Sequence, residues 1–187
     1  RVRAALRTKR FQDVLAVRAQ IDGLTGLWNR RFFNDHLSKE LRKAADQDLH
    51  VGLAFMDVDK FKLLNDNHGH PFGDLVLQTI SNHMSATLAS SDVACRYGGE
   101  EFALVLPGDT GLAAVTAERL RREIEALKIH KGEEIIPVTV SIGVAGTDLF
   151  ETKSAATPAL LLDAADRALY EAKRGGRNRI HVAPGRR

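Results

Sequence analysis

The sequence predicts an α/β (α+β) fold, in which a central, mixed and mostly antiparallel sheet is flanked by helices. Apolar runs of strand length alternate with amphipathic segments of helix length, which favours helices packed on the faces of a sheet. One pair of short apolar runs is separated by Gly98 and Gly99, a spacing typical of a β-hairpin. With 187 residues and 44% hydrophobic content, the chain is long enough for one domain with a substantial core, plus an appendage.

The first 20 residues are predicted to form a helix that leads into this domain. They contain no Gly or Pro, and their apolar residues recur at roughly helical spacing. The segment is too short to establish a coiled coil, so a signalling or linker helix and a merely solvated helix both stay open. The composition changes to a turn at 22–27, and we expect the main domain to occupy residues 21–187.

The elements of the main domain follow from local patterns. A helix is expected after Asn29, and residues 50–58 form an apolar run typical of a buried central strand. Pro71 suits an early helical position, and the paired glycines predict a tight turn in which both adopt positive φ. The full expected order after Asn29 is a helix, a strand over 50–58, helices over 60–67 and 71–88, a hairpin over 92–106, a helix over 112–127, a strand over 135–145, a helix over 158–173 and a short strand over 179–183.

The charge is distributed unevenly along the chain. The protein has 27 Lys and Arg against 24 Asp and Glu, but residues 1–20 and 173–187 together hold twelve of the basic residues and one of the acidic residues. The region between these two segments therefore has a net charge of −8. A general nucleic-acid-binding surface needs a basic stripe across the fold, so this distribution argues against nucleic acid as a partner.

The single cysteine, Cys95, bears on the compartment. No disulfide can form within the chain, so a reducing, cytoplasmic compartment is expected, with Cys95 as a small buried apolar residue. No apolar run approaches the roughly 18–20 residues of a membrane span, and we expect no membrane contact by this segment. Because the chain does not begin with methionine, we expect it to be part of a longer protein.

Acidic residues are predicted at the end of the central strand and at the hairpin turn. Asp57 falls at the carboxyl end of the strand, where open sheets usually place ligands, and the Val58 carbonyl offers a second hard oxygen. If the hairpin lies beside this strand, Glu100 completes a site for Mg²⁺, with Mn²⁺ as an alternative. Two simpler interpretations remain: Asp57 caps the next helix, and Glu100 and Glu101 merely solvate a Gly-Gly turn.

The segment after Asp57 has residues that suit a guanine nucleotide. A helix is predicted to begin around Phe61 and Lys62, and its free backbone N–H groups form a natural seat for phosphate. An aspartate only accepts hydrogen bonds, so Asp74 suits the N1–H and amino donors of guanine and would reject adenine. Asn65, which both donates and accepts, could complete this recognition.

Two basic residues, Lys173 and Arg177, lie at the end of the last predicted helix and four residues further on. Their spacing suits a clamp on a triphosphate. Basic residues in a final turn also oppose the helix dipole favourably, and glycine is the usual stop, so an ordinary helix end explains the same pattern.

Together these residues resemble the GGDEF family of diguanylate cyclases. Five segments carry the resemblance in order, between about residues 22 and 182: 22–31, 57–74, 98–102, 140–145 and 172–178. The signature at 98–102 reads GGEEF, with Glu100 where the family name has Asp. This difference preserves the carboxylate.

The resemblance implies a nucleotide-cyclase, palm-like sheet and the condensation of two GTP molecules into cyclic di-GMP with release of pyrophosphate. Asp57, Val58 and Glu100 would hold Mg²⁺, and Glu101 matches a second acidic catalytic position. One site holds one GTP, so we expect two protomers to face each other as a homodimer. The substrate-binding positions would be Phe61, Lys62, Asn65, Asp74, Gly98, Gly99, Lys173 and Arg177.

One position departs from the family pattern. The product-inhibition site of the family is an Arg followed, after two residues, by an Asp. Here Asp92 matches the Asp, but Ala89 stands at the Arg position. Alanine cannot clamp a guanine or a phosphate as a guanidinium does, so we expect this inhibitory site to be degenerate.

An active cyclase is the leading hypothesis, because every matched metal-binding and base-reading position holds a competent residue. A non-catalytic GTP-binding or signalling module is the main alternative. A helix-driven dimerisation element attached to an inactive domain is a third.

Overall fold

The computed structural model describes residues 20–185, so the helix expected over 1–20 lies outside them apart from Gln20. Within this part there are eight strands, five α-helices and two short 3₁₀ helices. The strands are β1 (Trp28–Asn29), β2 (Val51–Val58), β3 (Val93–Gly98), β4 (Glu101–Pro107), β5 (Ile129–Lys131), β6 (Glu134–Ile136), β7 (Val140–Gly146) and β8 (Ile180–Val182). The helices are α2 (Arg30–Gln47), α3 (Phe61–His68), α4 (His70–Thr87), α5 (Thr110–Glu125) and α6 (Pro158–Arg174), with η1 (Thr147–Leu149) and η2 (Lys153–Ala155).

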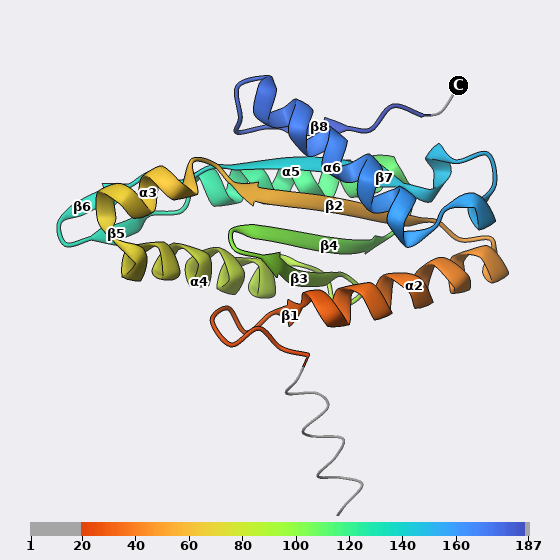
Figure 1. Cartoon of the computed structure of the whole chain (residues 1–187), viewed down its shortest axis with the longest axis horizontal. Helices are drawn as coiled ribbons and strands as arrows, with labels where there is room; N and C mark the ends of the chain where they lie inside the picture. The colour runs from red at the N-terminus through yellow and green to blue at the C-terminus, as the bar shows by residue number, and fades with distance from the viewer. Residues whose placement is uncertain (1–19, 186–187) are drawn as a thin grey trace, which may run out of the picture.

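A six-stranded sheet with the order β1-β3-β4-β2-β7-β8 forms the centre of the fold (Figure 1). The four inner strands pair antiparallel, whereas the outermost strands, β1 and β8, pair parallel with their neighbours. The mixed, mostly antiparallel sheet expected from the sequence is therefore confirmed. β2 lies between β4 and β7, which makes it the central strand that the apolar run predicted.

Both faces of β2 are covered by helices. Met56 and Val58 pack in a cluster with side chains of α4 and α5, whereas Leu53 and Phe55 pack with side chains of α2 and α6. Figure 1 shows α6 in front of the sheet and α5 behind it. Because β2 is buried along its whole length, its sequence is a continuous apolar run rather than an alternation.

Side-chain caps fix where three of the helices begin. The Asn29 side chain accepts a hydrogen bond from the backbone of Phe32 at the start of α2. Asp109 and Thr157 cap α5 and α6 in the same way, with donor–acceptor distances of 2.8 and 3.3 Å. Each cap satisfies a backbone N–H that has no partner within its helix.

The hairpin turn differs by one residue from the expectation. Gly98 pairs with Glu101, so the turn residues are Gly99 and Glu100 rather than the two glycines. Gly99 has a φ of +37°, but Gly98 does not adopt a positive φ. The expectation that both glycines do so is wrong, because an irregularity between Arg96 and Gly98 shifts the strand register. The turn therefore carries Glu100 at its tip.

The strand expected over 135–145 is also wrong as a single element. It consists of β6 and β7, separated by a segment that contains Pro137. Proline has no N–H to give to a ladder and interrupts the strand. β6 pairs instead with β5, a strand that was not expected, in a separate two-stranded sheet.

Between residues 20 and 185, no helix combines the length and the apolar character that crossing a membrane requires.

β7 and α6 approach each other closely at Gly143. A Cβ atom at this position would meet the carbonyl oxygen of Ala165 and the backbone nitrogen of Leu169, and would lie 2.8 Å from the Leu169 Cα atom. These are helix backbone atoms, which cannot rotate away as a side chain can. Glycine is therefore required for this packing, which fixes the helix that carries Lys173.

Gly143→Ala should lower the free energy of unfolding by about 3 kcal/mol, the upper end of the usual cost of overpacking, because the clash is with backbone. Urea denaturation measures this change. Gly23→Ala is the matched control, since a Cβ there meets nothing within 4 Å, and it should change the stability by less than about 0.5 kcal/mol. Equal stability of the two variants would show that β7 and α6 can separate without cost.

Candidate active site

Asp57 is an acidic residue at the end of the buried central strand. Its side chain is only 11% exposed, and its Oδ2 atom lies 2.9 Å from the ammonium of Lys173 at the end of α6. A carboxylate this buried needs a charged or hydrogen-bonding partner. Asp57 is not the cap of α3, because the residue at that position is Lys60 and no side chain bonds there. That simpler interpretation is therefore wrong.

The signature turn lies directly beside the end of β2. Asp57 pairs in register with Glu101, the first residue of β4, and the Val58 N–H donates to the Glu100 carbonyl at 3.3 Å. Hairpin pairing thus brings carboxylates from two distant parts of the sequence to one place. Gly98 is the last residue of β3, and Gly99 is the first of the two turn residues.

Arg96 holds the turn in place, a role that the sequence analysis did not assign. Its Nε and Nη2 atoms donate to the Gly99 carbonyl at 3.0 and 2.8 Å, and its Nη1 atom donates to Asp22 Oδ1 at 3.1 Å. Asp22 also accepts hydrogen bonds from the backbone and hydroxyl of Thr25. Arg96 therefore ties the signature turn to the turn at 22–27. Its position just before the signature was a visible signal, but its partner lies 74 residues away.

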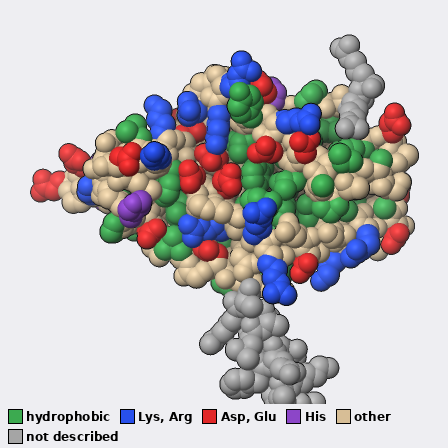
Figure 2. Space-filling view, viewed as in Figure 1, with side chains coloured by type: hydrophobic (Ala, Val, Ile, Leu, Met, Phe, Trp, Pro, Cys, Tyr) green, Lys and Arg blue, Asp and Glu red, His purple; other side chains and the backbone are tan. Residues whose placement is uncertain are grey.

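Negative charge is concentrated at this site. Burial raises the pKa of Asp57, as do the charges of Glu100 and Asp59, while Lys173 acts in the opposite direction. Burial also raises the pKa of Glu101, and the nearby charge of Asp57 adds to this effect. On the face shown in Figure 2, Asp and Glu side chains gather over the sheet, with Lys and Arg side chains on either side of them. Such crowding favours a cation among the carboxylates.

The donors at this site fit a hard divalent cation such as Mg²⁺. Asp57 and Glu100 can contribute carboxylates and Val58 a backbone carbonyl, and all of these are oxygen ligands. Among residues 20–185, no three His, Cys, Asp or Glu side chains gather as a complete set of metal ligands. A cation would therefore need additional oxygen from elsewhere, as Mg²⁺ sites that use substrate phosphates do.

α3 and α4 carry the residues expected to bind the nucleotide. Phe61 and Lys62 lie in the first turn of α3, where no side chain caps the free N–H groups. Asn65 packs against Gly73 so closely that a Cβ on Gly73 would meet the Asn65 Oδ1 atom. That oxygen is buried and has no hydrogen-bond partner within the described residues. An unpaired buried acceptor is costly, and a ligand can supply the missing donor only if the Asn65 side chain turns away from Gly73. Asp74 follows Gly73 and is exposed.

Arg177 lies in the loop between α6 and β8 and is exposed, with a φ of +64°. Together with Asp59 and Lys60 it lines a hollow of about 550 Å³ beside the start of α3. The structure therefore places Arg177 near the helix start expected to bind phosphate.

The residues of the inhibitory site are not part of this cluster. The Asp92 carboxylate accepts a hydrogen bond from the backbone N–H of Ala89 at 3.0 Å, within the loop between α4 and β3. Asp92 thus stabilises its own turn. The residue at the expected arginine position supplies only its backbone.

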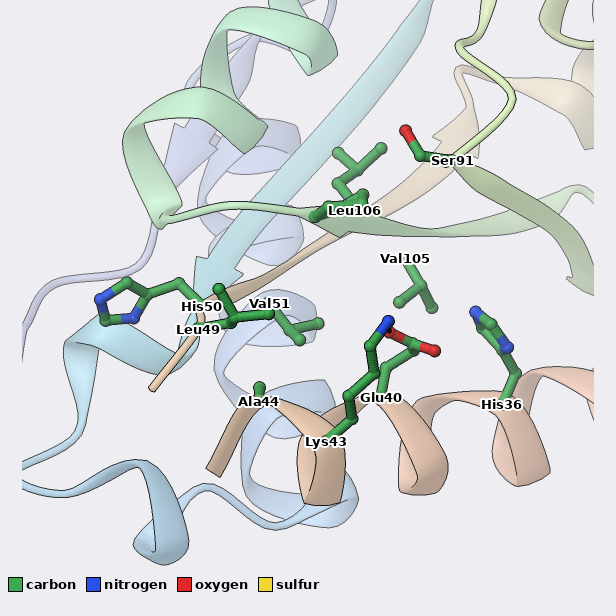
Figure 3. Close-up of a pocket in the computed structure, with 11 residues that line it drawn as sticks. His36, Glu40, Lys43, Ala44, Leu49, His50, Val51, Ser91, Val105 and Leu106 are labelled. Carbon is green, nitrogen blue, oxygen red and sulfur yellow. Dashed lines mark ion pairs between the residues drawn. The ribbon is translucent and has the colours of Figure 1, made fainter. Parts of the chain in front are cut away.

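A separate cavity of about 240 Å³ lies at the opposite end of β2, beside Val51 (Figure 3). His36, Glu40 and Lys43 extend into it from α2, while the ring of His50 points away from them. None of the predicted site residues lines this cavity, and the clustered carboxylates are better evidence for the location of the chemistry.

Comparisons with known proteins agree with this geometry. A family model described as "Diguanylate cyclase, GGDEF domain" matches residues 19–179. The response regulator PleD of Caulobacter vibrioides is 36% identical over 191 residues, covering 96% of this chain and 41% of PleD. The diguanylate cyclase VdcA of Vibrio cholerae is 39% identical over 184 residues, covering 95% of this chain and 52% of VdcA. The chain thus spans about half or less of the length of these two relatives.

Solved structures show the same fold. The GGDEF domain of DgcB from Caulobacter crescentus in complex with c-di-GMP has a TM-score of 0.80 and 36% identity, covering 88% of this chain and 93% of that one. The diguanylate cyclase SiaD of Pseudomonas aeruginosa in complex with its activator SiaC has a TM-score of 0.82 and 34% identity, covering 97% and 70%. With the family model matched over most of its length, this chain belongs to the GGDEF family of diguanylate cyclases.

Proposed function

We propose that this domain condenses two GTP molecules into cyclic di-GMP and two pyrophosphates. The observation that best supports the proposal is the meeting of Asp57, the Glu100–Glu101 turn and Lys173 at the end of β2. These groups come from a strand, a hairpin and a helix that are far apart in the sequence. Carboxylates for a cation and an ammonium for phosphate at one point suit transfer of a nucleotidyl group.

In this proposal Asp57, the Val58 carbonyl and Glu100 hold Mg²⁺ or Mn²⁺. When bound, the cation supplies charge that lowers the pKa of the attacking hydroxyl and stabilises the leaving pyrophosphate. Lys173 is already placed 2.9 Å from Asp57, so its ammonium can contact a phosphate that shares the cation. Arg177 and the first-turn N–H groups of α3, at Phe61 and Lys62, bind the remaining phosphate oxygens.

Asn65 and Asp74 read the base. The amide of Asn65 has both a donor and an acceptor and can hydrogen-bond guanine once its side chain turns away from Gly73, and the exposed Asp74 carboxylate accepts from the N1–H and amino donors. Adenine has an acceptor at N1 and lacks the 2-amino group, so it would leave these oxygens without donors. Selection of GTP over ATP follows from this mismatch.

The reaction takes place in two steps, in which the 3′-oxygen of each ribose is joined in turn to the α-phosphorus of the other nucleotide, and the second step closes the ring and releases the second pyrophosphate. The bond between the α-phosphorus and the bridging oxygen of the β-phosphate breaks, and pyrophosphate leaves. The hydroxyl proton passes to a carboxylate, for which Glu101 is suited by its place opposite Asp57 in the register of β4 and β2. Positioning and electrostatics carry most of the acceleration.

Each protomer presents one nucleotide, and the product contains two. We therefore propose that catalysis takes place between two protomers related by a twofold axis, as a homodimer. We further propose that residues 1–20 form a lead-in helix and residues 21–187 the catalytic domain. We also propose that the protein is cytoplasmic and that a sensor domain lies upstream.

The direct test is incubation with GTP and Mg²⁺, with the products separated by chromatography. Cyclic di-GMP and pyrophosphate should form, and the rate should rise more steeply than linearly with protein concentration at low concentration, because the active species is a dimer. GTP binding without product would identify a non-catalytic module. A strictly linear rate would contradict catalysis between protomers.

Glu100→Ala is the matching variant for the site. It should lower the rate about 100-fold or more, because the cation loses one of its two carboxylates. Glu151→Gln removes one exposed negative charge on the loop between η1 and η2 and should leave the rate unchanged. An unaltered rate in Glu100→Ala would remove this residue from the mechanism.

Divalent cations should raise the melting temperature in a pH-dependent manner. The raised pKa values of Asp57 and Glu101 mean that the folded protein binds more protons than the unfolded chain across their titration range. These groups therefore stabilise the fold less as the pH rises through that range. A cation offsets the repulsion between the ionised forms, so the increase in melting temperature caused by Mg²⁺ should be larger at about pH 8 than at about pH 5.

Thermal melts with and without Mg²⁺ and a non-hydrolysable GTP analogue measure this effect. Asp57→Asn keeps the size of the side chain and removes the charge, so it should abolish the increase caused by the metal. An equal increase in Asp57→Asn would place the cation elsewhere.

The inhibitory site should not bind product tightly. In calorimetry, the wild type and Asp92→Ala should bind cyclic di-GMP with the same affinity, because Ala89 offers no guanidinium to complete the site with Asp92. Conversely, Ala89→Arg should strengthen cyclic di-GMP binding by about tenfold or more by restoring a charged clamp. Tight wild-type binding that disappears in Asp92→Ala would show that the site is functional.

A further inference from the structure

The loop after α6 has an unusual backbone. Gly176, Arg177 and Asn178 have φ values of +113°, +64° and +45°. Glycine and asparagine tolerate the left-handed region, but arginine has no such preference. Three consecutive residues in this region persist only where the surrounding structure fixes them. The loop therefore needs an anchor.

The end of α6 holds part of the loop, because the Arg177 N–H donates to the Ala172 carbonyl at 3.1 Å. Asn178 adds three hydrogen bonds that connect the loop to other elements. Its backbone N–H donates to Asp59 Oδ2 at 3.0 Å, its Nδ2 atom donates to Glu125 Oε1 at 2.6 Å, and its Oδ1 atom accepts from Arg121 Nη1 at 2.6 Å. Glu125 and Arg121 both belong to α5, on the other face of the sheet from α6. The side chain of Asn178 is thus held entirely by α5.

Arg121 is itself fixed. Its side chain is only 11% exposed, and its Nε and Nη2 atoms form a two-pronged contact with Glu118 at 2.9 and 3.0 Å. Its Nη1 atom also donates to Glu125 at 2.8 Å. A planar guanidinium bonded on two sides keeps one orientation, so it can act as a rigid support for Asn178.

The second support is Asp59, which directly follows β2, the strand that carries Asp57. Asp59 accepts hydrogen bonds from the hydroxyls of Ser141 and Thr139 at 2.6 and 2.8 Å, in addition to the bond from Asn178. These contacts fix Asp59 at the end of β2, two residues after Asp57. The hydrogen bond from Asn178 to Asp59 therefore connects the loop directly to the proposed metal site.

Arg177, by contrast, is exposed, and no hydrogen bond or ion pair to another residue of the described range 20–185 engages its guanidinium. Its backbone is fixed, while its charged group is available to a ligand. This arrangement is what a side chain needs if it is to meet a phosphate without a large loss of conformational freedom on binding.

We propose that Arg121 is a positioning residue: through Asn178 it holds the loop 175–178 in the shape that presents Arg177 to the phosphates of GTP. The inference rests on the proposed function for the identity of the ligand. It adds a residue from the opposite face of the sheet that touches neither substrate nor metal.

A double-mutant cycle tests this route. Calorimetry with a non-hydrolysable GTP analogue should show about tenfold weaker binding for Arg121→Gln, because Arg177 is no longer held in place. Combining Arg121→Gln with Arg177→Ala should weaken binding no further than Arg177→Ala alone, since the first change acts through the second residue. Additive losses would overturn the proposal, because a merely structural role gives additivity.

Arg122→Gln is the matched control. Arg122 lies next to Arg121 and bonds the same Glu118 at 2.6 Å, but it does not bond Asn178. It should bind the GTP analogue as the wild type does. If Arg121→Gln fails to fold, Asn178→Gly removes both side-chain bonds to α5 while keeping the freedom for positive φ, and it should give the same non-additive loss with Arg177→Ala.

Amide hydrogen exchange separates this inference from the proposed function. In Arg121→Gln the amides of Arg177 and Asn178 should exchange faster, while those of β7 should not change. Unchanged protection of Asn178 would refute the anchoring whatever the ligand. If the wild type does not bind GTP at all, the proposed function fails and the phosphate role of Arg177 fails with it, even where the exchange result supports the anchor.

Discussion

The structure depends on keeping a charged carboxylate, that of Asp57, at the end of a strand that is buried on both faces. Removing such a charge from water costs several kcal/mol unless a partner compensates. Lys173, 2.9 Å away, compensates part of this cost, but Glu100 and Asp59 add negative charge to the same place. The site therefore contains more negative charge than the fold needs for its own stability. Such an excess is expected where a protein is built to receive a cation, because groups that serve function are often less than optimal for stability.

The fold meets this requirement with elements that can move little. β2 is fixed by pairing on both sides, and α6 approaches β7 at Gly143 closely enough that no side chain fits there. Lys173 therefore lies on a helix whose distance from the sheet is set by the backbone contact at Gly143. The antiparallel pairing of β4 with β2 brings the turn to the end of β2 and sets Glu101 opposite Asp57. Ion pairing, helix packing and strand register thus all contribute to placing these residues together at the end of β2.

The sequence predicted the parts of this arrangement that have local causes. The apolar run of β2, the hairpin and the helix after Asn29 follow from patterns over a few residues, and the structure confirms them. The turn residues were wrong by one position, because the irregularity after Arg96 leaves no sign in the composition. The contacts of Arg96 with Asp22 and of Arg121 with Asn178 span 74 and 57 residues. Neither could be predicted, since a single long-range polar contact produces no periodicity.

The two long-range contacts solve the same physical problem. A group that binds a ligand must be exposed, yet an exposed loop is usually free to move. The side chains of Arg96 and Arg121 are only 17% and 11% exposed, and each forms an ion pair with a carboxylate. Arg96 also donates to the backbone of the signature turn, and Arg121 donates to the Asn178 side chain in the loop after α6. Arginine suits this task because its planar fork has several donors in fixed directions, whereas a lysine ammonium offers a single point of attachment. The turn that carries Glu100 and the loop that carries Arg177 can therefore be exposed at their tips and fixed at their bases, which is the condition that the proposed binding of phosphate and metal requires.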